Sequence, residues 1–209
     1  MKLLKRYKVK TVIDVGANVG QYAEGLRNNG YHGQIFSFEP LSEAHEILMA
    51  KSQGDSSWRV MERCAVGAEP GTTMINISEN SVSSSILNMT EAHVDAAPTS
   101  GYVGQEEIEV VSLTQILPEL LKEGERCHLK IDTQGYEEFV LKGSSKIMHR
   151  VSSVELELSL SEMYEGSWLA HDAINHMAGI GFRLYTVFPF FQDKATGETF
   201  QMDAIFVRA

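Results

Sequence analysis

The most constraining feature of the sequence is an apolar strand that runs directly into a turn with two glycines four positions apart. Residues 11–15 are Thr-Val-Ile-Asp-Val, and Gly16 and Gly20 bracket the turn that follows. Glycine at such a turn lets a ligand approach the backbone and lets the next helix pack closely on the sheet. A second strand-like run, residues 35–38, leads to the acidic Glu39, which can accept both hydroxyl groups of a ribose. The pattern predicts a nucleoside cofactor.

The spacing of the turn bears on which nucleoside cofactor binds. Dinucleotide sites use a G-x-G-x-x-G turn, and Asn18 stands here where such a site needs a glycine beside the pyrophosphate. S-adenosylmethionine carries no phosphate, and its carboxylate and ammonium groups can be bound by an amide, by Asp14 and by free backbone groups. The methyl donor is therefore favoured. An NAD-linked oxidoreductase and a non-catalytic nucleoside-binding module are the two alternatives.

Five motifs together resemble those of the FkbM-type methyltransferases. They are Asp14-Val-Gly-Ala-Asn-Val-Gly20, Ser37-Phe-Glu-Pro40, Ala65-Val-Gly67, Leu129-Lys-Ile-Asp-Thr-Gln-Gly-Tyr-Glu137 and Gln201-Met-Asp-Ala-Ile-Phe206. The resemblance covers nearly the whole chain and implies S-adenosylmethionine-dependent O-methylation of a hydroxyl group, often on a sugar or a polyketide-like natural product. It also implies the class I methyltransferase fold, which is Rossmann-like.

Hydrophobic periodicity predicts an α/β fold in which strands and helices alternate. The pattern indicates one domain over residues 1–209 with a doubly wound, mostly parallel seven-stranded sheet and one antiparallel strand. Two further β-type segments, residues 72–77 and 108–111, indicate a small β insertion, and the polar stretch 78–107 is a possible lid over the pocket. The expected strands are 11–15, 34–38, 58–64, 128–132, 153–159, 182–188 and 203–208, and the expected helices are 19–29, 42–51, 113–122, 136–148 and 171–179.

Ligands of open α/β sheets bind beyond the carboxyl ends of the strands, so the residues just past each strand are the candidate site. A small residue at a strand end leaves room for a flat ring, and the resemblance implies that Ala65 and its neighbours form the adenine slot. The candidate cofactor-binding residues are Asp14, Gly16, Asn18, Gly20, Glu39, Pro40, Cys64, Ala65, Val66, Asp132 and Gln134.

Methyl transfer to a hydroxyl needs a group that takes up the hydroxyl proton. Asp132, at the end of the fourth strand, is the first candidate, with Glu157 and Glu137 as supporting carboxylates. His93, in the polar stretch, is a further candidate base because the usual pKa of histidine lies near 6.5. Asp132 and Glu157 could instead chelate a divalent ion, but the sequence contains no compact ligand spacing, so metal-free catalysis is favoured.

Composition limits the partners. The formal charge of −10 has the wrong sign for a protein that binds nucleic acid, which draws its affinity from Lys and Arg at phosphates. No apolar run reaches the roughly eighteen residues of a membrane span. Cys64 and Cys127 lack metal or redox spacing, so we expect reduced thiols in a cytoplasmic protein. The expected acceptor is a hydroxyl of a small molecule or glycan, and no oligomeric state follows from the sequence.

Overall fold

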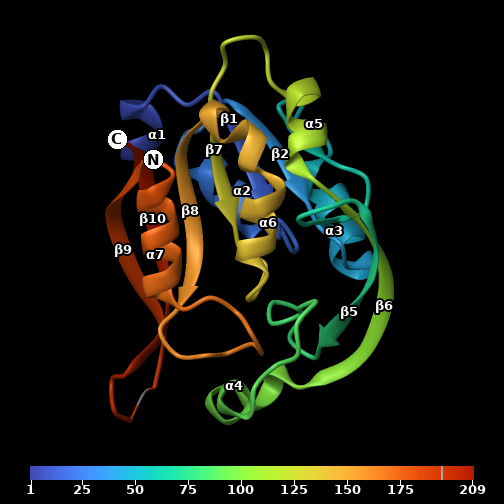
Figure 1. The fold of residues 1–209 in the computed structure, drawn as a ribbon. Coiled ribbons are helices and arrows are strands. Elements are labelled where there is room, and N and C mark those ends of the chain that lie inside the picture. The colour runs from blue at the N-terminus through green and yellow to red at the C-terminus, as the bar shows by residue number, and fades with distance from the viewer. Residues whose placement is uncertain (194) are drawn as a thin grey trace.

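A computed structural model describes residues 1–193 and 195–209, and within these ranges a seven-stranded sheet forms the centre of the molecule (Figure 1). Only β10 runs antiparallel to its neighbours in this sheet, which confirms the predicted fold class. In spatial order the strands are β3 (Trp58–Val60), β2 (Gln34–Phe38), β1 (Thr11–Val15), β7 (Cys127–Ile131), β8 (Val151–Ser159), β10 (Thr199–Arg208) and β9 (Phe182–Gln192).

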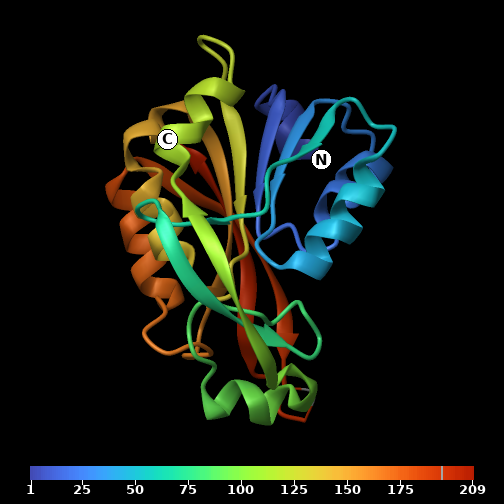
Figure 2. The ribbon, with the colours of Figure 1, turned by 90° about the vertical axis from the view of Figure 1, so that its right-hand side faces the viewer.

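Helices cover both faces of this large sheet (Figure 2). One face packs against α5 (Leu113–Leu120), α6 (Glu137–Gly143), the 3₁₀ helix η2 (Ser145–Arg150) and α7 (Ala170–Gly179). The opposite face packs against α1 (Lys2–Arg6), α2 (Gln21–Asn28) and α3 (Ser42–Ser52). Crossover helices on both faces explain why the central strands are buried along their whole length.

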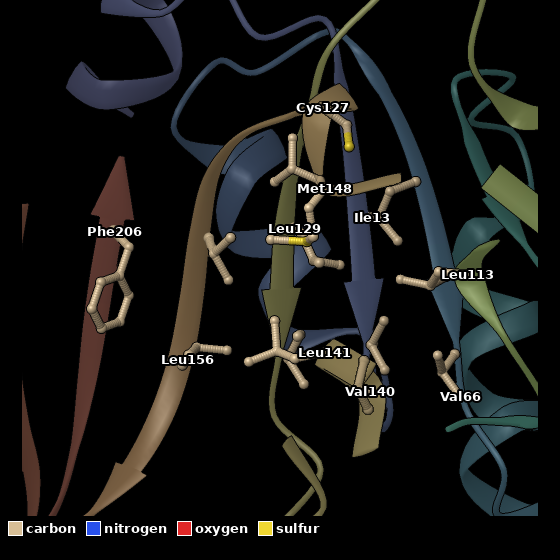
Figure 3. Close-up of a cluster of buried hydrophobic side chains, with 14 of the residues drawn as sticks. Ile13, Val66, Leu113, Cys127, Leu129, Val140, Leu141, Met148, Leu156 and Phe206 are labelled. Carbon is tan, nitrogen blue, oxygen red and sulfur yellow. The ribbon is translucent and has the colours of Figure 1, made fainter. Parts of the chain in front are cut away.

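The larger core lies between the sheet and the face covered by α5, α6 and α7. Ile13, Leu129 and Leu156 project from three neighbouring strands toward Val140 and Leu141 of α6 (Figure 3). All five side chains are buried, and each contributes about 1.5–3 kcal/mol relative to an exposed position. This core fixes the strands whose carboxyl ends carry the candidate site.

A second, small sheet lies beside the carboxyl ends of the large one, and it confirms the predicted β insertion. Its strands are, in spatial order, β4 (Ala65–Val66), β6 (Tyr102–Val111) and β5 (Gly71–Ser78). β6 begins six residues before the predicted start, and a helix α4 (Glu91–Ala96) and a 3₁₀ helix η1 (Pro98–Ser100) occupy part of the polar stretch. The loop expected over 78–107 is therefore shorter and partly helical. In Figure 1, α4 lies below the carboxyl ends of the strands.

Two predicted elements are each divided in the structure. The strand expected at 58–64 ends at Val60, because its only partner among the described strands, β2, ends at Phe38, and the chain then crosses to the small sheet. The helix expected at 136–148 ends at Gly143. There the Ser144 hydroxyl donates to the Val140 carbonyl at 2.7 Å, a local bond that competes with helix continuation.

Candidate functional site

A cavity of about 380 Å³ lies at the carboxyl ends of β1, β2 and β7, where the sequence places the cofactor. It has an apolar part, formed by Phe38, Ala65, Val66, Ile75 and Ile86, and a polar part toward β7. The predicted cofactor-binding residues that line it are Gly16, Asn18, Glu39, Pro40, Cys64, Ala65, Val66, Asp132 and Gln134. Asp14 and Gly20, which belong to the same prediction, lie outside the cavity wall.

The glycine turn after β1 is required by the protein's own packing. Gly16 has φ +76°, and a Cβ there would stand 1.8 Å from the main-chain carbonyl oxygen of Asp132. Gly20 has φ +89°, and a Cβ there would lie 2.9 Å from the Trp58 ring, so this glycine lets α2 sit close to the sheet as predicted. Gly16 also lines the cavity, and the atom that excludes a side chain from this position belongs to the β7 loop, so packing requires the glycine independently of any ligand.

Glu39 joins the loops that follow β1 and β2. Its Oε2 accepts the Asn18 N–H at 2.7 Å, and its Oε1 accepts the Leu41 N–H at 2.9 Å. Burial raises the pKa of Glu39 to about 7, against the lowering effect of these two hydrogen bonds. Each carboxylate oxygen has a further lone pair, so the group can still accept hydrogen bonds from a ligand.

Lys130 of β7 forms ion pairs with two carboxylates, those of Asp132 and Asp14. Its Nζ lies 3.2 Å from Oδ2 of Asp132 and 3.6 Å from Oδ1 of Asp14, and it donates to the Gly16 carbonyl at 3.3 Å. Asp14 is fully buried, and Ser37 donates to its other oxygen at 3.1 Å. The expected contact of Asp14 with the methionine ammonium is therefore wrong in its geometry, because this carboxylate faces Lys130 and Ser37 from inside the sheet.

Asp132 and Glu157 form a pair bridged by Gln134. The Gln134 side-chain amide donates to Oδ1 of Asp132 at 2.8 Å and to Oε2 of Glu157, and its Oε1 accepts the Tyr164 hydroxyl at 2.7 Å. Burial opposes ionisation of Asp132, yet the charge of Lys130 and hydrogen bonds from Gln134 and Glu157 bring its pKa below the usual value. Burial, followed by repulsion from Asp132, raises the pKa of Glu157 well above its usual value. These opposite shifts favour the ionised form of Asp132 and the protonated form of Glu157.

Glu137 organises the loop that carries Asp132. Its Oε1 accepts the Thr133 N–H at 2.9 Å, the Thr133 hydroxyl at 3.0 Å and the Gly135 N–H at 3.3 Å. Burial raises the pKa of Glu137 to about 7. Glu137 lies outside the cavity wall, so it positions the loop while Asp132 faces the cavity.

His93 lies apart from this cavity. It is buried in α4, with its ring 5.0 Å from that of Tyr164 in an edge-on arrangement and 5.8 Å from that of Phe191. Burial lowers the pKa of His93. The expectation that this histidine reaches the acceptor from a flexible loop is therefore wrong, because the segment is helical and its histidine packs inward.

Several polar residues of the cavity wall escaped the sequence prediction, and Tyr22, Lys130, Glu155 and Asp203 are among them. The sequence did contain an indication of these residues, because polar side chains alternate along two strands. His128 and Lys130 alternate along β7, with Asp132 two positions further on, and Glu155 and Glu157 alternate along β8. Alternation places such residues on one face, here the face covered by α2. The Tyr22 hydroxyl donates to Oε2 of Glu155 at 2.9 Å, and burial, followed by Glu155 and Asp132, raises the pKa of Asp203 to about 6.

Every helix in residues 1–193 and 195–209 is too short or too polar to cross a membrane. The described His, Cys, Asp and Glu side chains form no group of three or more arranged to hold a metal ion.

The order and directions of the strands in the large sheet are those of the class I methyltransferase fold. Solved structures share this fold over the whole chain at low sequence identity. A SAM-dependent methyltransferase from Aquifex aeolicus has a TM-score of 0.50 and 12% identity, with coverage of 100% of this chain and 88% of that one. TrmK from M. capricolum, in complex with S-adenosyl-homocysteine, has a TM-score of 0.54 and 6% identity, with coverage of 100% and 68%. The methyltransferase domain of bacterial CtHen1-C has a TM-score of 0.51 and 10% identity, with coverage of 100% and 94%.

The family is established by sequence. Residues 14–184 match the model of the methyltransferase FkbM domain, and the chain belongs to this family. Membership confirms the methyltransferase class and S-adenosylmethionine as the cofactor, and it leaves the NAD-linked alternative without support. No curated protein matches the chain in sequence.

Proposed function

We propose that this protein is an O-methyltransferase that acts on a hydroxyl group of a carbohydrate or secondary metabolite. The observation that carries the proposal is Asp132, whose side chain is 36% exposed in the cavity wall while Lys130 keeps it ionised. An ionised carboxylate beside the cofactor can accept the hydrogen bond of an acceptor hydroxyl and then take up its proton. When bound, S-adenosylmethionine supplies the electrophilic methyl group on a sulfonium.

The cavity fits this cofactor. Its apolar part, which includes Ala65 and Val66 of the short strand β4, suits a flat adenine ring, and Glu39 with its remaining lone pairs suits the two ribose hydroxyls. The backbone at Gly16 and the Asn18 side chain lie at the polar end, where the amino acid part of the cofactor would lie.

The residues around Asp132 divide the catalytic work. Gln134 fixes the orientation of the carboxylate, and Lys130 stabilises its charge before reaction. As the C–O bond forms and the bond from the methyl carbon to the sulfonium breaks, the hydroxyl proton would pass to Asp132, and the raised pKa of Glu157 favours its protonated form, which does not compete for this proton. Positioned proton transfer of this kind contributes about 10²–10⁴-fold to a rate.

Charge favours a neutral acceptor over a nucleic acid. The chain carries a formal charge of −10, and Asp132, Glu155 and Asp203 in the cavity wall face a single lysine, Lys130. An RNA strand would bring phosphates toward these carboxylates, whereas sugar hydroxyls can donate hydrogen bonds to them.

The test is transfer of a radiolabelled methyl group to a mixed panel of glycosides and polyols, with total tRNA as a separate acceptor. We expect transfer to at least one hydroxylated compound and none to tRNA. Asp132→Asn should lower kcat by about 10²–10⁴-fold while the affinity for S-adenosylhomocysteine changes little. Methylation of tRNA alone would contradict the proposed acceptor class, and tight cofactor binding without transfer to any acceptor would favour the non-catalytic module.

A further inference from the structure

A second cavity, of about 430 Å³, lies between α1, α2 and the exposed side of β10 and β9. It shares three wall residues, Gln21, Tyr22 and Glu155, with the cofactor cavity. The two cavities are therefore neighbours on the same face of the sheet, separated by the Tyr22–Glu155 hydrogen bond of 2.9 Å.

Strand register explains which residues meet along this path. Asp203 of β10 pairs with Glu157 of β8 on one side and with Phe188 of β9 on the other. Asp203 lines the cofactor cavity and Phe188 lines the second one. Directly opposite residues of antiparallel strands project to the same face of the sheet. Glu157, Asp203 and Phe188 therefore form a row across three strands, which leads from the carboxylates of the candidate site to an aromatic ring.

The two ends of this row differ in chemistry. The negative charges of Glu155 and Asp132 act on the Asp203 carboxylate, and the positive charge of Lys130 opposes them. Phe188 is 54% exposed, and Leu3, Leu26 and Ile205 add apolar surface to the second cavity, whose wall also carries the polar Asn29 and His128. A hydroxyl donor suits the first end, and an apolar group suits the second.

We propose that the second cavity is a subsite for the methyl acceptor, which holds an uncharged apolar part of it while Asp203 accepts a hydrogen bond from one of its hydroxyl groups. The inference rests on the proposed function and adds a substrate class to it: an amphiphilic hydroxylated molecule, such as a glycoside with an apolar aglycone. Anionic acceptors are disfavoured because Asp203 and Glu155 would repel them.

The experiment measures binding by calorimetry to the full chain saturated with S-adenosylhomocysteine. Octyl β-D-glucoside, below its micelle concentration, is the probe with both halves of the proposed ligand. Methyl β-D-glucoside lacks the tail, and octyl sulfate replaces the sugar by an anion. We expect octyl glucoside to bind at least about tenfold more tightly than either of the other two probes.

Variants locate the binding. Phe188→Ala and Asp203→Asn should each weaken octyl glucoside binding by roughly tenfold. Phe190→Ala is the matched control, because Phe190 is 52% exposed on the same strand and lies outside both cavity walls. Truncation of either exposed ring should leave the unfolding transition almost unchanged, and a circular dichroism melt verifies that the variants fold.

Equal binding by all variants would show nonspecific detergent adsorption and would overturn the proposal, as would no measurable binding of octyl glucoside. The two proposals fail separately. Binding that depends on Phe188, without methyl transfer to any acceptor, would keep the subsite and remove the O-methyltransferase assignment. Methyl transfer whose KM for octyl glucoside is the same in the wild type and in Phe188→Ala would remove the subsite and keep the enzyme.

Discussion

Affinity for the cofactor should depend on pH through Glu39. Burial raises the pKa of this carboxyl to about 7, and a ribose hydroxyl binds best to the ionised form. At pH 6 about one molecule in eleven carries the ionised group, so the affinity for S-adenosylhomocysteine should be about tenfold lower than its value well above pH 7. Because binding favours ionisation, the affinity rises with pH through 7, and the complex releases a proton when it forms.

Calorimetry between pH 5.5 and 7.5 measures how the affinity for S-adenosylhomocysteine changes with pH. Repeating the titration in buffers of different ionisation enthalpy measures the number of protons released on binding. Glu39→Gln should remove the pH dependence, and because the amide offers one acceptor oxygen for the two N–H groups of Asn18 and Leu41, it should also cost about 1–3 kcal/mol of stability. Glu137→Gln is the control that should keep the slope, because Glu137 lies outside the cavity wall. A flat profile in the wild type, or the same slope in Glu39→Gln, would refute the assignment of Glu39 as the ribose ligand.

Two further predictions concern stability. Gly16→Ala should destabilise the fold by about 2–5 kcal/mol in a urea titration, because its φ of +76° disfavours a side chain and the new Cβ would overlap the Asp132 carbonyl. The control is Gly25→Ala in α2, where a Cβ meets nothing within 4 Å. This variant should be neutral or stabilising in the same titration. The raised pKa of Glu137, about 7, makes its contribution to stability complete below about pH 4.5 and lost as the pH rises through 7, so this group alone should lower the unfolding free energy by roughly 3 kcal/mol over that interval, beside a similar loss from Glu39. Glu137→Gln keeps the acceptor oxygen and should make the profile shallower by the Glu137 contribution; an unchanged profile in the variant would contradict the attribution.

The sequence was sufficient for the central strands and for the position of the candidate cavity. β1 and β2 begin and end at the predicted residues, because both are apolar runs bounded by Gly16, Gly33 and Pro40, which interrupt a strand. Ligand sites of this kind lie at strand ends, so the positions of Glu39 and Asp132 followed from the strand boundaries alone.

The remaining features depended on contacts between distant segments. The orientation of Asp14 is set by Lys130, a residue 116 positions away in the chain that pairs with it across the sheet. The inward packing of His93 depends on Tyr164, from the loop after β8. Local patterns carry no information on such partners, so the predicted roles of Asp14 and His93 were wrong while the class of the site was right.

The two hydrogen bonds that Glu39 accepts give this residue a structural role in addition to its proposed role as the ribose ligand. One side chain fastens the loop after β1 to the loop after β2, through the backbone of Asn18 and of Leu41. A protein of this kind that no longer transferred methyl groups would still be destabilised by the loss of Glu39, because the same mutation would loosen two neighbouring loops. A glutamate at this position therefore has a structural reason to be there, and its presence alone would not be a sign of activity.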